Sequence, residues 1–243
     1  EGAAMAGGNL DHVRCSREDE IRALNRADVL LAIQEEEGEL LTAMCPDREV
    51  LVVRHALVIP PYTPSPGASN GLLYVGNRYD PNVLGLARIM DAVWPRVRQQ
   101  CPDATLTICG RVGETLRRRH PGVRITGHVA DLAPYYEAAS VVLNPVPYGT
   151  GLKIKTVEAL AHGRCVVCSE AGTGGLGTPE ELPLGLAKTD EDMVAVIVRL
   201  LRNTEERHAM ELRAWHHAQQ HFSPDVIYRT LCARLDRHAE DAR

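Results

Sequence analysis

A glycine-rich loop between a predicted strand and a predicted helix carries residue types that bind anions. Gly149 and Gly151 let the backbone approach a ligand closely, and Lys153 and Lys155 add two cationic side chains. The first amide groups of a helix lack intrahelical partners and carry partial positive charge, which favours an anion at that end. The loop and the start of its helix therefore predict a phosphate-binding site.

Glu158, further along the same predicted helix, adds an acceptor for hydroxyl groups. It follows Gly151 by seven residues, which is about 10 Å along a helix. Carboxylates that accept two hydroxyl hydrogen bonds are the usual means of binding a ribose. A phosphate at the helix start and a diol beside Glu158 would be separated by the length of one nucleoside diphosphate. The alternative is a capped helix with an exposed Lys155–Glu158 ion pair, and the spacing alone leaves both open.

The elements that must position these residues alternate regularly after residue 71. The apolar patterns predict strands at 72–75, 105–109, 123–126, 141–143 and 165–168. They predict helices at 83–101, 114–119, 132–139, 152–162 and 191–222, the last with a break near Asn203. Pro95 should kink the first of these helices. Such alternation predicts an α/β fold, a Rossmann-like parallel sheet covered by helices on both faces, in which ligands bind at the carboxyl ends of the strands.

A proline-rich segment divides the chain. Four prolines between residues 60 and 66 predict a stiff, extended linker. The predicted parts are 1–58, with strands at 29–33 and 50–53 around a helix at 35–44, the linker at 59–70, the α/β domain at 71–222, and a C-terminal helix at 223–243. The Gly/Ala-rich stretch up to Leu10 is expected to be poorly ordered, and Ser16 is expected to cap the first helix.

Composition excludes several classes of protein. Apolar residues make up 44% of the 243 residues and charged residues 24%, as in globular proteins rather than disordered tails, collagens or coiled coils. The net charge of -5 argues against a nucleic-acid partner. No apolar run approaches the roughly 18 residues of a membrane span. The seven cysteines are scattered and odd in number, which predicts reduced thiols in a cytosolic protein.

Four further patterns have simpler interpretations. The sequence CVVC at 165–168 lies in an apolar run and is interpreted as a buried strand rather than a metal or redox site. Residues 172–177 fit G-x-G-x-x-G, but a proline soon afterwards would end the helix that a dinucleotide site requires. The basic residues at 117–120 are interpreted as a solvated face. His217 and His221 have a spacing that suits a metal, but no third ligand is visible, so we expect no metal.

The segment Gly149–Gly163, GTGLKIKTVEALAHG, resembles the donor-binding helix of GT-B glycosyltransferases in the large retaining group called glycosyltransferase family 4, or group 1. Other segments resemble further parts of that family in the same order: LYVGN at 73–77, DPNV at 80–83, PDATLTICG at 102–110, and the loop region at 123–136. The resemblance covers about residues 72–190. It implies that 1–58 is a remnant of the N-terminal acceptor-side domain and that 71–222 is the domain that binds a nucleotide sugar.

The resemblance also implies roles for individual residues. Glu158 corresponds to the ribose-binding Glu of the family, and Lys155 or Lys153 would neutralise the donor phosphate as its bond to the sugar breaks. We therefore take Lys155 and Glu158 as the catalytic pair. The implied donor contacts are Gly76, Gly151, Leu152 and Lys153 for the diphosphate, His128 and Val129 for the base, and Asn77, Arg78, Arg111 and Thr150 beside them.

Two positions depart from the family pattern. The family has a Glu beside the donor sugar, eight residues before the ribose-binding Glu, and here that position is Thr150. An Arg that is common after the first strand is replaced here by Asn77, for which Arg78 and Arg111 are the candidate substitutes.

These features together predict the donor-binding part of a glycosyltransferase. It would transfer a sugar from a UDP- or GDP-sugar to an unknown glycan or small-molecule acceptor, with retention implied by the resemblance alone. The alternatives are a GT-B nucleotide-sugar epimerase and a non-catalytic nucleotide-sugar-binding module. We expect no cofactor, no metal, no nucleic-acid partner and no transmembrane segment, and a location in the cytoplasm, either free or peripheral at the membrane. Catalysis in a cleft between two domains requires residues from both domains, so this chain alone should bind the donor weakly and transfer little sugar.

Overall fold

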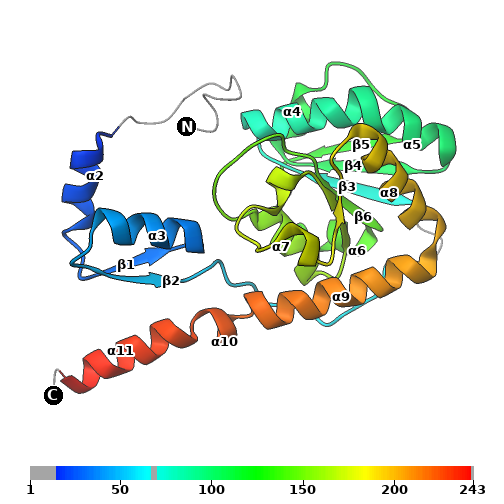
Figure 1. The fold of residues 1–243 in the computed structure, drawn as a ribbon. Helices are drawn as coiled ribbons and strands as arrows, with labels where there is room; N and C mark the ends of the chain where they lie inside the picture. The colour runs from blue at the N-terminus through cyan, green and yellow to red at the C-terminus, as the bar shows by residue number, and fades with distance from the viewer. Residues whose placement is uncertain (1–14, 67–69, 242–243) are drawn as a thin grey trace.

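A six-stranded parallel sheet forms the centre of the computed structural model, which describes residues 15–66 and 70–241 (Figure 1). Its strand order is β5-β4-β3-β6-β7-β8. The strands are β3 (Gly71–Val75), β4 (Thr105–Cys109), β5 (Val123–Gly127), β6 (Val141–Asn144), β7 (Cys165–Cys168) and β8 (Gly185–Leu186). The chain moves outward from β3 to β5 and then returns to β6 on the other side of β3. The point where the strand order reverses therefore lies between β3 and β6, where such sheets bind ligands.

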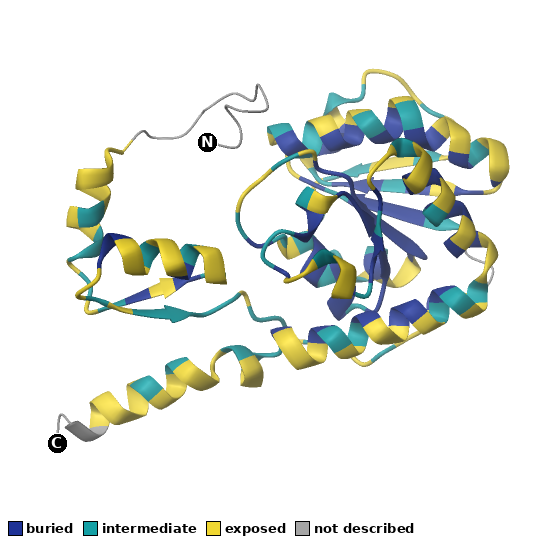
Figure 2. Ribbon diagram, in the orientation of Figure 1, coloured by how far each residue is buried: buried dark blue, intermediate teal, exposed yellow. Residues whose placement is uncertain are grey.

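Helices cover both faces of this sheet, as the sequence predicts. One face packs against α4 (Asp80–Arg88), α5 (Trp94–Gln100) and α8 (Asp190–Arg202), and the other against α6 (Ala133–Ala138), α7 (Ile154–Ala161) and α9 (Thr204–Phe222). Side chains of β3 alternate between the two faces of the sheet. Leu72 and Tyr74 pack against the first group of helices, and Leu73 packs against the second. Figure 2 shows that buried residues are concentrated in the inner strands β3, β4, β6 and β7. We call residues 71–222 the large lobe.

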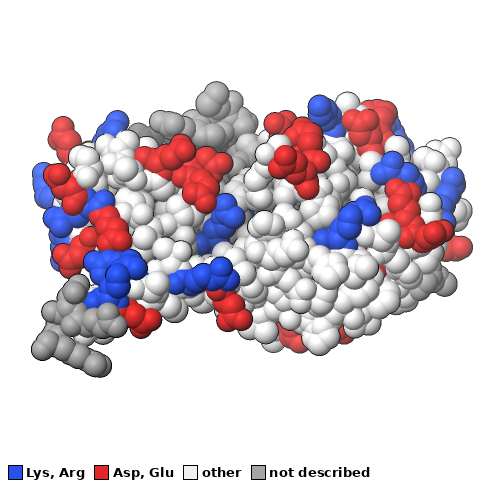
Figure 3. Space-filling model, turned by 60° about the horizontal axis from the view of Figure 1, so that its bottom comes forward, with Lys and Arg blue, Asp and Glu red and all other residues white. Residues whose placement is uncertain are grey.

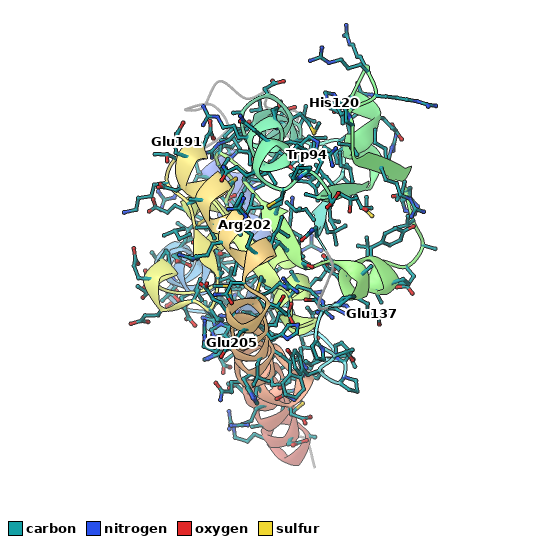
Figure 4. All side chains as sticks on the ribbon, turned by 90° about the vertical axis from the view of Figure 1, so that its right-hand side faces the viewer. Trp94, His120, Glu137, Glu191, Arg202 and Glu205 are labelled. Carbon is teal, nitrogen blue, oxygen red and sulfur yellow. The ribbon has the colours of Figure 1, made fainter. Side chains whose placement is uncertain are left out.

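The predicted kink at Pro95 takes the form of a π-helical turn. Residues Ile89–Val93 form this turn between α4 and α5, directly before Trp94, which is labelled in Figure 4. Pro95 has no amide hydrogen to donate to the carbonyl of Asp91, and its ring would crowd that carbonyl in a regular α-helix. The wider turn resolves this conflict, and it keeps both halves packed against the sheet, with Ile89 and Trp94 buried.

Three predicted helices differ in the structure. The basic helix expected at 114–119 is wrong, because a short 3-10 helix occupies Arg111–Thr115. Gly113 lets this turn pack closely against Ile125, because a Cβ at position 113 would lie 2.5 Å from the Ile125 side chain. The helix expected from residue 152 begins at Ile154, and the C-terminal helix is divided into α10 (Pro224–Ile227) and α11 (Arg229–Asp241). The predicted break at Asn203 is confirmed, since Asn203 ends α8 and caps α9.

A smaller unit precedes the linker, and we call residues 15–53 the small lobe. It contains α2 (Arg17–Leu24), β1 (Val29–Ala32), α3 (Glu35–Met44) and β2 (Glu49–Val52), and the two strands pair in parallel. Ser16 caps α2, as predicted, by accepting a hydrogen bond from the amide of Asp19. The Gly/Ala-rich stretch up to Leu10 lies outside the described residues.

A buried ionic cluster attaches the linker to the large lobe. Glu211 of α9 lies 3.8 Å from both Arg164 and Arg207, and all three side chains are almost fully buried. Arg164 donates to the carbonyl of Thr63 over 2.8 Å, and the amide of Ser65 donates to Glu211 over 3.0 Å. The segment that the prolines stiffen is therefore packed against the large lobe. At the other end of the chain, α11 returns towards the small lobe (Figure 1), where Arg234 pairs with Glu49.

Candidate functional site

A cavity of about 350 Å³ opens at the carboxyl ends of β3, β4 and β5. It is lined by Val75, Gly76, Asn77, Asn82, Gly110, His128, Val129, Leu132, Ile154, Lys155 and Glu158. These residues come from four strand-to-helix segments that are far apart in the sequence. The cavity thus lies beside the point where the strand order reverses, as expected for a Rossmann-like sheet.

Two glycines form the floor of the cavity between β3 and β4. The amide of Gly76 donates to the carbonyl of Cys109, and the amide of Gly110 donates to the carbonyl of Gly127. Gly110 has a φ of +94°, and a Cβ there would collide with the backbone oxygen of Gly76. Only glycine allows the two loops to approach this closely, and the absence of side chains at both positions leaves space where a ligand can lie.

Lys155 crosses the cavity from α7 to the start of α4. Its Nζ donates to Asn82 Oδ1 over 2.5 Å and lies 5.5 Å from the ring centroid of Tyr74. Asn82 Nδ2 in turn donates to the carbonyl of Asn77 over 3.1 Å, which connects the ammonium to the glycine loop. Burial, and secondarily the charge of Lys153, lowers the pKa of Lys155 to about 8. An anion beside this ammonium would offset the unfavourable burial of its charge.

Glu158 lies one turn after Lys155 on the same side of α7. It is half-buried, and its Oε2 accepts a hydrogen bond of 2.9 Å from the hydroxyl of Tyr136. Among the described residues, Oε1 accepts no hydrogen bond from the protein. The cavity therefore presents a cation, a glycine floor without side chains, and a carboxylate with free acceptor capacity.

Lys153 does not lie where the sequence predicts it, which was beside the donor diphosphate. Its Nζ donates to the carbonyls of Gly149, Thr150 and Gly151 at 3.0, 3.0 and 2.9 Å. This side chain closes its own loop and does not line the cavity. Leu152 is also withdrawn, because it packs in the core beneath α7. Thr150, Gly151, Leu152 and Lys153 are thus not brought to the cavity, which the first turn of α7 reaches through Ile154 and Lys155.

The two arginines considered as substitutes for Asn77 also lie away from the cavity lining. Arg78 is exposed, and Arg111 is exposed with its Nε 4.0 Å from Glu114. Within the described residues, Lys155 is therefore the one Lys or Arg that lines the cavity. Gly76, Asn77, His128 and Val129 do line it, together with Lys155 and Glu158.

Sequence reasoning missed several residues of the site. Asn82 was visible only as part of the Asp-Pro-Asn entry to a helix, and Gly110 only as the end of a strand. Tyr136 was visible only as the end of the region at 123–136 that resembles the family, because one buried tyrosine is not distinguished from any other core residue. Their roles depend on contacts between elements.

The remaining patterns stay outside the site. Cys165 and Cys168 are fully buried in β7, as their apolar neighbours predict. Residues 172–177 are followed by a single short 3-10 helix at Pro179–Glu181 rather than by the α-helix of a dinucleotide site. In residues 15–66 and 70–241, no three His, Cys, Asp or Glu side chains gather in a way that could hold a metal ion. Figure 3 shows basic and acidic side chains interspersed on one face rather than gathered into a single basic area.

Comparison with known proteins assigns the family. A family model described as "Glycosyl transferases group 1" matches residues 69–203, which is 135 of the 243 residues. The chain belongs to the group 1 glycosyl transferases. The matched region runs from just before β3 to the end of α8, so this family membership rests on the part of the chain that builds the cavity.

The relatives of this group 1 chain show the extent of the likeness. A protein of Klebsiella pneumoniae, "Uncharacterized 44.6 kDa protein in cps region", is 25% identical over 172 residues, which is 66% of this chain and 44% of that protein. The crystal structure of TarM has a TM-score of 0.69 at 14% identity, over 93% of this chain and 47% of TarM. HepE of Anabaena in complex with UDP-glucose has a TM-score of 0.64 at 16% identity, over 92% of this chain and 68% of HepE.

These likenesses establish the fold as that of GT-B glycosyltransferases. The chain spans less than half the length of the Klebsiella relative and of TarM. In the part of the chain that the structure describes, no helix is both long and apolar enough to cross a bilayer.

Proposed function

We propose that the large lobe binds the nucleoside diphosphate of a UDP- or GDP-sugar in the cavity and serves as the donor-binding part of a glycosyltransferase. The observation that carries this proposal is the convergence of Lys155, Glu158 and the Gly76 loop from elements that are remote in sequence. In this arrangement Glu158 accepts hydrogen bonds from the ribose hydroxyls. The Lys155 ammonium holds the diphosphate, for which the absence of a side chain at Gly76 leaves room. The segment at His128 and Val129 contacts the base.

Lys155 supplies the electrostatic part of catalysis in this proposal. During transfer, the bond between the anomeric carbon and the β-phosphate oxygen breaks, and the oxygen of the acceptor hydroxyl takes its place. The acceptor proton leaves to solvent or to the departing diphosphate. Negative charge grows on the diphosphate as the bond breaks, so a fixed ammonium beside it stabilises the transition state more than the ground state.

Several features outside the cavity support the wider proposal. HepE, which shares the fold, has structures with UDP and with UDP-glucose, and this supports a uridine nucleotide as the first candidate. By the family resemblance we take the small lobe as a remnant of an acceptor-side domain, and we expect retention and a glycan or small molecule as the acceptor. All seven cysteines are unpaired, which supports a location in the cytoplasm.

Calorimetric titration with UDP and GDP tests the donor site. Glu158→Ala should lower the affinity for the preferred nucleotide by roughly 1.5–3 kcal/mol, or about 10- to 150-fold, because hydrogen bonds to a charged group are lost. Glu205→Ala is the matched control, since Glu205 is an exposed carboxylate on α9, well separated from α6 and its Glu137 in Figure 4. Binding of neither nucleotide, or equal effects of both variants, would contradict the proposal.

A further inference from the structure

A buried phenol supports the carboxylate that we assign to the ribose. Only 1% of Tyr136 is exposed, and its hydroxyl donates to Glu158 Oε2 over 2.9 Å. Burial, reinforced by the charge of Glu158, holds the pKa of Tyr136 well above its usual value. The phenol therefore keeps its proton across the neutral range, and the bond always runs from the phenol to the carboxylate.

The ring of Tyr136 is itself held in place by α7. His162, one turn after Glu158, stacks on it with ring centroids 4.9 Å apart and ring planes at 13°. Burial lowers the pKa of His162, so this imidazole is neutral at neutral pH and offers no positive charge that would draw the carboxylate towards itself. Tyr136 thus contacts Glu158 within α7 and His162 at the C-terminal cap of α7, and its hydroxyl has a fixed position relative to Glu158.

Glu158 lies between two cavities, so the orientation of its side chain determines which cavity the carboxylate faces. It lines the cavity assigned to the donor and also a second cavity of about 310 Å³, which Leu57 and Val58 line just before the linker. Tyr136 lines the second cavity and not the first. A glutamate side chain has three rotatable bonds, so without a fixed donor the carboxylate would be distributed over orientations that face either cavity.

We propose that Tyr136 is a positioning residue whose hydroxyl holds Glu158 in the orientation that accepts hydrogen bonds from the 2′ and 3′ hydroxyls of the donor ribose. This inference rests on the proposed function, because it requires the nucleotide to bind in the donor cavity. Tyr136 does not touch the ribose. It acts by removing the other orientations of Glu158, and it therefore determines how strongly the site prefers a ribonucleotide to its deoxy analogue.

The test compares a nucleotide with its 2′,3′-dideoxy analogue. The affinities of whichever of UDP and GDP binds more tightly, and of its dideoxy form, are measured by titration for the unaltered chain and for Tyr136→Phe. The Phe variant keeps the ring and its stacking on His162, and it removes only the oxygen. Tyr135→Phe is the matched control, since Tyr135 is a half-buried neighbour on α6 whose hydroxyl has no hydrogen-bond partner among the described residues.

The expected result is a change in selectivity rather than a general loss of binding. Tyr136→Phe should lower the ratio of ribonucleotide to dideoxynucleotide affinity about five- to tenfold, with the dideoxy affinity within about twofold of its starting value. Tyr135→Phe should leave both affinities unchanged. In a Glu158→Ala background, Tyr136→Phe should have no further effect on the ratio, because the group that it positions is absent.

Several results would overturn the positioning role. An unchanged ratio in Tyr136→Phe would do so, and so would an equal loss for both ligands, which would indicate a packing role only. A drop in the ratio that persists in the Glu158→Ala background would show that Tyr136 acts by another route. Failure of the unaltered chain to bind UDP or GDP at all is a separate outcome, which overturns the proposed function and this inference with it.

Discussion

Replacement of Lys155 by Met tests whether one ammonium group holds the donor diphosphate. Met keeps most of the length and apolar volume of the lysine stem, which packs beside Tyr74, and it removes only the charge and the hydrogen bond to Asn82. Lys155 is the one Lys or Arg among the described residues that line the cavity, so no second Lys or Arg of the lining can take over its role.

The expected magnitude follows from the distance at which the ammonium would meet a phosphate. Two unit charges about 4 Å apart attract by about 4 kcal/mol at an effective dielectric constant of about 20. Desolvation of the phosphate offsets part of this attraction, and hydrogen bonds between charged groups retain roughly 2–3 kcal/mol. Lys155→Met should therefore weaken UDP binding about 30- to 150-fold. Uridine has no phosphate, so its affinity should change by less than about twofold.

The pH dependence of UDP binding gives a second test of the same group. The pKa of Lys155 is lowered to about 8, and a diphosphate prefers the charged form. UDP affinity should be highest below about pH 8, where Lys155 is charged, and should decline as the pH rises above that value. In Lys155→Met the affinity should be flat across this window.

The same variant should stabilise the protein without ligand. The folded-state pKa of about 8 is lower than the usual 10.5, so the unfolded chain binds the extra proton between these values, and the free energy of unfolding rises with pH there. This difference in pKa means that the buried ammonium lowers the free energy of unfolding by roughly 3 kcal/mol at pH 7. Lys155→Met should therefore raise the melting temperature while it weakens UDP binding.

The assay is calorimetric titration with UDP and uridine at pH 7, 8 and 9, with Lys188→Met as the control because Lys188 is exposed and does not line the cavity. An unchanged ratio of UDP to uridine affinity in Lys155→Met would refute the assignment of this lysine to the diphosphate. A parallel loss of uridine affinity would also refute it, since that result would indicate disruption of the whole site.

Three other predictions concern the fold. Glu211→Gln leaves two buried arginines without their carboxylate and should lower the free energy of unfolding by about 3–5 kcal/mol in a urea titration; a change below about 1 kcal/mol would contradict the role of this cluster. Gly110→Ala should lower the melting temperature and UDP affinity together, because a Cβ there meets the neighbouring loop, whereas Gly127→Ala, which has positive φ but open space, should affect stability only. In the folded protein a thiol reagent should modify Cys15 and Cys232 quickly and the five buried cysteines only after unfolding, and rapid modification of more than two thiols would count against the burial described.

The sequence by itself determined the α/β class and the order of the elements. Apolar runs and helical periodicity are local properties, and they located every strand of the large sheet except the two-residue β8. Local signals also placed the cap at Ser16 and the break at Asn203, because a cap depends on residues three or four positions apart. Helical spacing predicted Lys155 and Glu158, since both lie on one side of a single helix. The family resemblance added four further lining residues, Gly76, Asn77, His128 and Val129.

Only the tertiary structure decided which side chains complete the cavity. The hydrogen bond from Lys155 to Asn82 joins residues 73 positions apart, and that from Tyr136 to Glu158 joins residues 22 positions apart. Lys153 has the same charge and nearly the same place in the sequence as Lys155, yet it closes its own loop. These contacts depend on the order of strands in the sheet and on the rotation of α7, both of which are set by packing between elements that no local pattern encodes.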